Sequence, residues 1–171
     1  DYALLRDEFL CLPKPSVPSS RSDAFQILAT LGGSDPGNHS LKVIRALSLL
    51  DDHNVQAKLV VGGSNPDWSS LSDAARDVKS VRLVRDAVMP REMSEADLAI
   101  TAGGSTCWEL AYMGVPSMVL VVAENQVGIA GALQRSGAAL SLGWADDVSA
   151  EGIAESVRYL LATPRKREGM A

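Results

Sequence analysis

A glycine-rich turn followed by two hydroxyl side chains is the part of this chain with the clearest chemistry. The apolar stretch at residues 96–101 leads into Gly103 and Gly104, and Ser105 and Thr106 follow directly. Glycine lets a backbone turn tightly and approach a ligand, and the first turn of a helix presents unpaired N–H groups to an anion. The pattern therefore predicts a strand, a turn and a helix start that together bind phosphate.

Glu109 lies four residues after Ser105, in the same predicted helix. Its carboxylate would stand at the mouth of the phosphate site, where it can accept hydrogen bonds from ribose hydroxyls. The spacing thus favours a nucleotide diphosphate as the ligand. The alternative is an ordinary strand-to-helix turn with a Ser or Thr cap and no ligand, because such glycine turns are common in α/β folds.

A second glycine-rich loop, which contains Gly33 and Ser34, follows the predicted strand at residues 25–31. Open α/β sheets bind ligands beyond the carboxyl ends of their strands, so we expect this loop to face the same crevice as the first. An ordinary capped turn, with the helix starting at Asn38 or Ser40, is the alternative here.

Two further strand ends carry polar residues. The Gly-Gly-Ser turn at residues 62–64 precedes Asn65 and Pro66, which are typical of a helix cap and a first helical residue, so we interpret it as structural. Asn125 and Gln126 follow a very apolar strand, and their amides can both donate to and accept from a sugar. A solvated helix start is the alternative for this pair.

The elements that must position these residues alternate regularly along the chain. Strand-like runs are predicted at about residues 25–31, 56–62, 80–84, 97–101, 116–122 and 138–142, and helices at about 38–51, 66–78, 90–95, 105–113, 124–136 and 149–162. This alternation predicts an α/β fold, a Rossmann-like parallel sheet of about six strands with helices on both faces. We expect one domain at residues 25–171, preceded at residues 1–24 by an arm and a Pro- and Ser-rich linker.

Composition excludes several classes of function. The net charge of −5 offers no basic surface, so we expect no nucleic-acid partner. The two cysteines and two histidines lack the spacing of a disulfide framework or zinc site, and no run of about 18 apolar residues could span a membrane, which favours a cytoplasmic location. Because the chain opens at Asp1 without Met, we expect it to be a piece of something longer.

The glycines also lack the spacings of dinucleotide-binding folds and of P-loops, which argues against NAD and Mg-ATP. Helix N-termini and hydroxyls can carry phosphate charge, and no paired carboxylates with metal-ligand spacing lie beside the predicted site. We therefore expect no metal and no cofactor. His39 and His53 are not part of any Ser-His-acid or Cys-His pattern, and we assign no catalytic role to them.

The segments at residues 2–9, 31–36, 99–110 and 123–126 together resemble the carboxyl-terminal domain of the UDP-sugar hydrolases of pseudaminic acid biosynthesis, the UDP-2,4-diacetamido-2,4,6-trideoxy-β-L-altropyranose hydrolases. The resemblance runs from residue 2 to about residue 143. More distantly, the pattern is similar to the nucleotide-sugar-binding half of the GT-B fold, as in the N-acetylglucosaminyltransferase that makes lipid II.

The resemblance implies a role for each candidate residue. It places the diphosphate on Gly104, Ser105 and Thr106 and the ribose hydroxyls on Glu109. Uracil would lie against residues 85–89, and the loop of Gly33 and Ser34 would close over the phosphates. Asn125 and Gln126 would meet the sugar. The implied ligand is thus a UDP-sugar, and the implied reaction releases UDP and a free 2,4-diacetamido-trideoxy sugar.

The departure from that family concerns catalysis. Its members carry an amino-terminal domain with a histidine proposed as the base that activates water, and this chain contains no such segment. General-base help is worth about 10² to 10⁴ in rate, so the resemblance implies that the chain alone binds without turnover. The same residues would also suit the donor-binding domain of a GT-B glycosyltransferase, or a non-catalytic module that binds a nucleotide-sugar.

Overall fold

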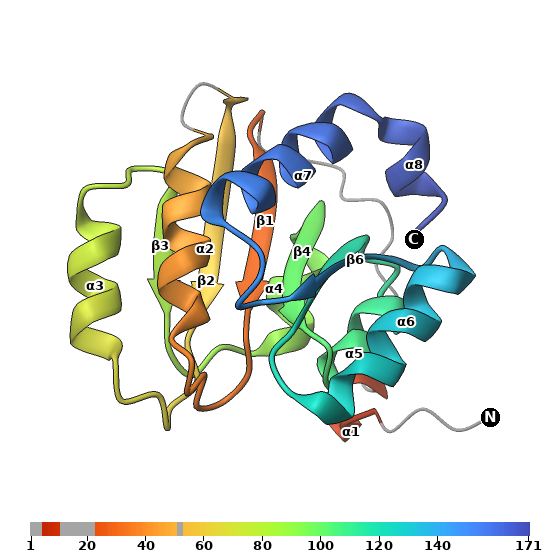
Figure 1. Ribbon diagram of the computed structural model, residues 1–171, viewed down its shortest axis with the longest axis horizontal. Coiled ribbons are helices and arrows are strands. Elements are labelled where there is room, and N and C mark those ends of the chain that lie inside the picture. Colours follow the sequence, from red (N-terminus) through yellow and green to blue (C-terminus); the bar gives the residue numbers. More distant parts are fainter. Residues whose placement is uncertain (1–4, 11–22, 51–52) are drawn as a thin grey trace.

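A six-stranded parallel sheet forms the centre of the protein (Figure 1). The computed structural model describes residues 5–10, 23–50 and 53–171. The strand order is β3-β2-β1-β4-β5-β6. In chain order the strands are β1 (Phe25–Thr30), β2 (Val55–Val60), β3 (Val81–Val84), β4 (Leu98–Ala102), β5 (Ser117–Val121) and β6 (Ala139–Trp144).

Helices cover both faces of the sheet, as the sequence predicts (Figure 1). One face packs against α2 (His39–Ser48), α3 (Trp68–Arg76) and α7 (Ala150–Ala162). The other packs against α4 (Met89–Ser94), α5 (Thr106–Tyr112) and α6 (Val127–Ser136), the last preceded by the short 3₁₀ helix η2 (Glu124–Gln126). Successive side chains of a strand point to opposite faces of the sheet, so Ile27 packs in the core on the first face and Leu28 in the core on the second.

The central strands are apolar because both of their faces are covered. Every residue of β4 and β5 is buried, which is the pattern of a parallel strand between two helical layers. Strand β2, nearer the edge, instead alternates: Gln56 is exposed and Lys58 is half-buried, whereas Ala57 and Leu59 are buried. The short helix α4 therefore covers the β2 side of its face less completely than α5 and α6 cover the centre.

The strand order places two of the predicted loops next to each other. The chain moves outward from β1 through β2 to β3, and in the opposite direction from β4 through β5 to β6, so the order reverses between β1 and β4. Thr30 and Thr101 are paired in register near the carboxyl ends of these two strands. Open α/β sheets bind ligands at such a reversal point, and the loops of Ser34 and Ser105 both leave the sheet there.

Two short helices were not predicted from the sequence. Helix α8 (Pro164–Glu168) is very polar, so it has no apolar periodicity to reveal it. Arg167 anchors it by donating to the carbonyls of Leu160 and Leu161 at the end of α7, and its guanidinium lies 5.0 Å from the centre of the Phe25 ring. Helix α1 (Asp7–Leu10) belongs to the predicted arm. The predicted linker, residues 13–20, lies outside the described residues.

Candidate functional site

The glycine turn after β4 is folded back onto the neighbouring strand end. The N–H of Gly103 donates to the carbonyl of Leu120 and to Oε1 of Gln126, each at 3.1 Å. The N–H of Gly104 donates to the carbonyl of Ala102 at 2.8 Å. A Cβ atom on Gly103 would lie 3.0 Å from Cβ of Gln126, so a side chain there would push the turn away from η2. Glycine thus sets the path that leads into α5.

Helix α5 begins with free backbone donors. Ser105 is its N-cap residue, is exposed, and makes no capping hydrogen bond with its side chain. Within the part of the chain that the structure describes, no acceptor pairs with the N–H of Ser105 or Thr106. Such N–H groups and the helix dipole attract an anion. Of the three predicted phosphate-binding residues, Ser105 and Thr106 therefore have unpaired N–H groups at the carboxyl edge of the sheet, whereas the N–H of Gly104 is paired with Ala102.

The start of helix α2, on the other side of the reversal point, is already paired with a carboxylate of the protein. The carboxylate of Asp35 accepts hydrogen bonds from the N–H of His39 at 3.0 Å and of Ser40 at 2.8 Å, and Asp35 is only 3% exposed. The geometry is that of a helix cap, and the left-handed backbone of Asp35, with φ 41°, directs the carboxylate to the helix start. Of the two neighbouring helix starts, only that of α5 keeps its donors open.

The loop of Gly33 and Ser34 is supported by the third Gly-Gly-Ser turn. Oγ of Ser64 donates to the carbonyl of Gly33 at 2.9 Å. Gly62 approaches so closely that a Cβ atom there would lie 2.2 Å from the Gly33 carbonyl oxygen. Ser34 itself is exposed. The turn that we interpret as structural from the sequence therefore supports the backbone of a predicted ligand loop.

Glu109 has a partner that sequence reasoning missed. Its carboxylate is 3% exposed and receives two hydrogen bonds from Arg6, Nε to Oε1 at 2.6 Å and a terminal nitrogen to Oε2 at 3.0 Å. These bonds raise the pKa of Arg6 above its ordinary value, so the guanidinium stays charged. Arg6 comes from the predicted arm, 103 residues away. The only sequence signal was that the arm shares in the family resemblance.

The polar pair after β5 divides into an exposed and an engaged residue. Asn125 is exposed. Gln126 is half-buried, and its Oε1 accepts from the N–H of Val122 as well as from that of Gly103, each at 3.1 Å. The sequence assigned both residues to the sugar. The structure gives Gln126 a further role as a brace between the glycine turn and the end of β5.

The segment proposed to meet the base follows β3. The guanidinium of Arg85 lies 4.1 Å from the centre of the Trp68 ring, which is an ordered cation–π contact. Asp86 adopts a left-handed backbone with φ 50°, and Val88 is 55% exposed. An apolar side chain thus remains open at this end of the segment.

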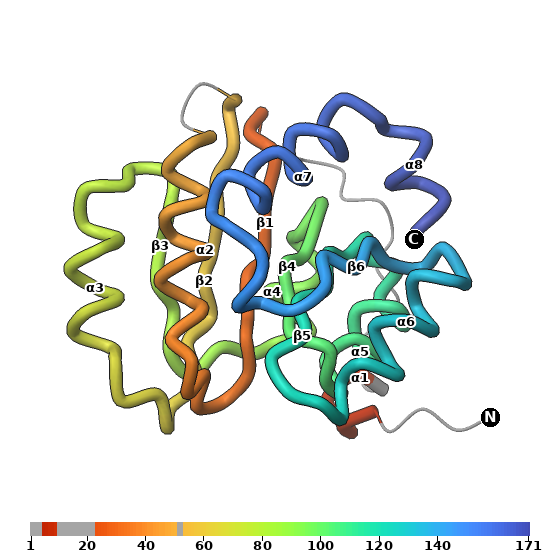
Figure 2. The backbone as a smooth tube through the Cα atoms, viewed as in Figure 1, coloured from red at the N-terminus to blue at the C-terminus, as the bar shows by residue number. Residues whose placement is uncertain are grey.

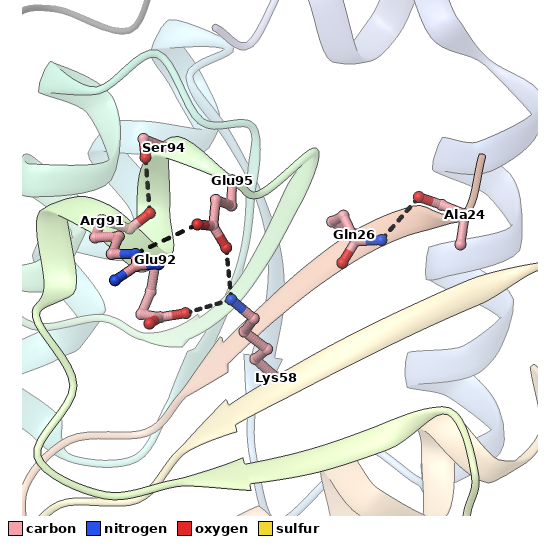
Figure 3. Close-up of polar contacts among 7 residues, drawn as sticks. All are labelled: Ala24, Gln26, Lys58, Arg91, Glu92, Ser94 and Glu95. Carbon is pink, nitrogen blue, oxygen red and sulfur yellow. Dashed lines mark hydrogen bonds and ion pairs between the residues drawn. The ribbon is translucent and has the colours of Figure 1, made fainter. Parts of the chain in front are cut away.

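A separate cluster of charges lies on the sheet face under α4 and does not belong to this edge (Figure 3). Nζ of Lys58 contacts Oε2 of Glu92 at 2.7 Å and Oε2 of Glu95 at 2.6 Å. Desolvation opposes the charge on Lys58, but the hydrogen bonds to the two carboxylates outweigh it and raise the pKa of Lys58. The hydrogen bond from Lys58 lowers the pKa of Glu95. The cluster is satisfied internally.

Three features that would indicate other functions are a reactive cysteine, a cluster of metal ligands and a membrane-spanning helix. Cys107 is 1% exposed, and burial raises the pKa of its thiol to about 11, which disfavours the thiolate that a nucleophile needs. Among the residues that the structure describes, no three His, Cys, Asp or Glu side chains gather as metal ligands. No helix in these ranges is both long and apolar enough to cross a membrane.

Curated relatives extend well beyond the region that this chain matches. The chain is 28% identical over 165 residues to the spore coat polysaccharide biosynthesis protein SpsG of Bacillus subtilis (strain 168), covering 95% of this chain and 48% of that protein. It is 29% identical over 130 residues to the uncharacterized protein MJ1062 of Methanocaldococcus jannaschii, covering 73% and 27%. The chain thus spans at most about half the length of these relatives.

Solved structures share the fold at low sequence identity. MurG of Acinetobacter baumannii superposes with a TM-score of 0.72 at 18% identity, covering 96% of this chain and 47% of that one. The UDP-GlcNAc 2-epimerase of Neisseria meningitidis, solved with UDP-GlcNAc bound, gives a TM-score of 0.68 at 22% identity, covering 91% and 41%.

The family is shown by the sequence itself. Residues 29–171 match the glycosyltransferase family 28 C-terminal domain, and this range includes both ligand loops and all six strands except the start of β1. The six-stranded α/β sheet agrees with the match, because its structural neighbours include glycosyltransferases. The chain belongs to the glycosyltransferase family 28 C-terminal domain family.

Proposed function

We propose that this chain is the UDP-binding half of a two-domain enzyme that acts on a nucleotide-sugar. One observation carries the proposal: at the point where the strand order reverses, α5 presents the unpaired N–H groups of Ser105 and Thr106, while Asp35 fills the neighbouring helix start. The site is open to an anion on the side of the sheet where open α/β folds bind ligands.

Each candidate residue then has a defined task. Gly104, Ser105 and Thr106 form the diphosphate site: Ser105 and Thr106 supply backbone N–H groups and hydroxyls, and Gly104, which has no side chain, lets the phosphates approach the turn. Glu109 accepts hydrogen bonds from the ribose hydroxyls. Residues 85–89 contact uracil, Gly33 and Ser34 close over the phosphates, and Asn125 and Gln126 meet the sugar. The relatives that extend beyond the matched region support a second domain on the far side of the ligand.

The reaction that we propose for the complete enzyme is hydrolysis of a UDP-sugar. Water attacks, the bond between the sugar and the diphosphate breaks, and the products are UDP and a free 2,4-diacetamido-trideoxy sugar. A base on the second domain takes the proton from water. This chain supplies binding and orientation, which keep the two reacting groups in position.

Transfer of the sugar to an acceptor is the second candidate. The match to a glycosyltransferase domain family and the structural likeness to MurG favour it. Both reactions use the same donor site, so they differ only in what attacks the sugar. A binding module without catalysis would keep the site and lack both reactions.

Calorimetry on the 171-residue chain tests the binding site. We expect UDP to bind, and UDP-sugars to bind only slightly better, because much of the sugar's enclosure would come from the second domain. Glu109→Ala should weaken UDP more than tenfold, since a hydrogen bond to a charged group is worth roughly 1.5–3 kcal/mol, and Glu109→Gln should recover part. Glu155→Ala, at an exposed position on α7, is the control. If the chain is folded and shows no binding at millimolar UDP, the proposal is wrong.

A second experiment separates the reactions. The complete enzyme is incubated with UDP-sugars in the presence and absence of an acceptor, and UDP and free sugar are measured. Sugar release in water alone supports hydrolysis, and release that requires the acceptor supports transfer. The chain by itself should release no sugar, because the proposed base is on the second domain.

A further inference from the structure

The segment that precedes the family domain is docked at the edge of the sheet that carries the site (Figure 2). Phe9 is fully buried and packs in one cluster with Leu110 and Met113, at the end of α5. Arg6 lies over the ring of Phe9, with its guanidinium carbon 5.3 Å from the ring centre. A buried aromatic anchor therefore fixes the place of Arg6 beside α5.

The guanidinium is held in one orientation by two carboxylates. Its Nε and one terminal nitrogen form the bidentate pair with Glu109, and its other terminal nitrogen contacts Oε1 of Glu8 at 2.8 Å. A bidentate pair fixes the plane of both groups as well as their distance. The orientation of the Glu109 carboxylate is thus imposed from outside the family domain.

The burial of the two partners is unequal. The Glu109 side chain is 3% exposed, whereas that of Arg6 is 53% exposed. Each carboxylate oxygen has two acceptor positions, and Arg6 occupies only one on each. A buried carboxylate without a partner is costly, and near a diphosphate it would also repel the ligand. Arg6 removes that repulsion and leaves acceptor positions for a hydroxyl.

We propose that Arg6 is a positioning residue that orients Glu109 toward the ribose and neutralises its charge beside the diphosphate. The inference rests on the proposed UDP site and deepens it. It makes the preference of the site for ribonucleotides depend on a residue outside the domain that matches the family. Binding of the nucleotide is therefore coupled to the docking of the amino-terminal segment.

The test compares UDP with 2′,3′-dideoxy-UDP, which keeps the base and the diphosphate and lacks both ribose hydroxyls. Calorimetry gives the ratio of the two dissociation constants for each variant. We expect the unaltered chain to favour UDP more than tenfold. Arg6→Ala should bring the ratio close to one, mainly by weakening UDP. Arg6→Lys, which keeps the charge without the bidentate geometry, should give an intermediate ratio.

The control is Glu155→Gln, at an exposed position on α7 that does not contact Arg6, and it should leave the ratio unchanged. Circular dichroism verifies that each variant is folded, and Arg6→Lys carries the test if Arg6→Ala does not fold. If Arg6→Ala loses thermal stability but retains the ratio of the unaltered chain, the ion pair is structural and the inference is wrong, while the UDP site stands. The same reading applies to Arg6→Lys where it replaces Arg6→Ala. If the unaltered chain binds no UDP, the proposed function fails and the role of Arg6 fails with it.

Discussion

The side chain of Gln126 holds the backbone of Gly103: its Oε1 accepts the Gly103 N–H at 3.1 Å, and a Cβ on Gly103 would stand 3.0 Å from Cβ of Gln126. The same oxygen accepts the N–H of Val122 at 3.1 Å. Two donors on one oxygen fix the orientation of the amide, so Nε2 is the group left to donate to a ligand. The strand end, the glycine turn and η2 are thus tied at one point.

Replacement of Gln126 should separate its brace from its contact with a ligand. Gln126→Ala leaves the N–H of Val122 without its acceptor and leaves the N–H of Gly103 with only the carbonyl of Leu120. It should cost about 1–3 kcal/mol in the free energy of unfolding. Gln126→Glu keeps the acceptor and should retain most of that stability, but it removes the Nε2 donor. Urea unfolding measures the first effect and UDP-sugar calorimetry the second. Asn125→Ala, at an exposed position, should leave stability unchanged.

Gly62 should tolerate no side chain. Gly62→Ala would place Cβ 2.2 Å from the Gly33 carbonyl oxygen, so the loop of Ser34 must move. Overpacking of this kind costs typically about 1–3 kcal/mol, and we expect a loss in that range by urea unfolding. Gly63→Ala is the matched control, because a Cβ there meets nothing within 4 Å. Equal stability of the two variants would show that the loops are not in contact.

Asp35 should behave as a helix cap. Asp35→Ala removes the acceptor for the N–H groups of His39 and Ser40, and loss of a cap costs about 0.5–2 kcal/mol. Asp35→Asn keeps one acceptor oxygen and should lose less. Asp67→Ala is the control, because Asp67 stands at the start of α3 without a capping hydrogen bond from its side chain. Thermal unfolding would refute the cap if Asp35→Ala and Asp67→Ala gave the same midpoint.

The cluster of Lys58 and Glu95 should make stability depend on pH. The hydrogen bond from Lys58 lowers the pKa of Glu95, so the pair stabilises the fold above the unfolded pKa of Glu95 and is lost as the pH falls through the folded pKa. Both side chains are partly exposed, at 29% and 47%, so solvent screening keeps the effect small.

Urea unfolding of Lys58→Met measures this contribution. Its deficit in the free energy of unfolding should be about 1 kcal/mol near pH 7 and should shrink as the pH falls from there through the lowered folded pKa of Glu95. Lys79→Met, at an exposed position, provides the control. A deficit that stays constant across this range would mean that Lys58 acts through its packing and not through its charge.

Cys107 should be unreactive in the folded protein. Burial raises the pKa of its thiol to about 11, and the side chain is 1% exposed, so both the thiolate fraction and the access of a reagent are low. In a Cys11→Ser background, iodoacetamide near pH 8 should modify Cys107 only as fast as the chain unfolds, and urea should accelerate the reaction. Mass spectrometry follows it. Modification of the native chain at the rate of a free thiol would contradict the burial.

The sequence alone predicted the elements and their class well, because strand and helix signals are local. The apolar runs of β4 and β5 are buried throughout, as their composition requires. The alternation of strands and helices was enough to predict a parallel sheet with two helical layers, which is confirmed. Helix α8 was not predicted because its charged residues show no apolar periodicity. It is held in place by the contact of Arg167 with α7.

The candidate site was predictable only in part. The sequence could place the candidate residues after β1, β4 and β5 at one edge, because the carboxyl ends of parallel strands lie on the same edge of a sheet; their contact with a ligand stays a prediction. Only the tertiary structure decided which loops meet and which polar groups are already satisfied. Asp35 accepts hydrogen bonds from the start of α2, and Oε1 of Gln126 accepts one from the turn at Gly103. Glu109 is paired with an arginine 103 residues away. Pairings of this kind depend on strand order and packing between distant segments, and no local pattern in the sequence records them.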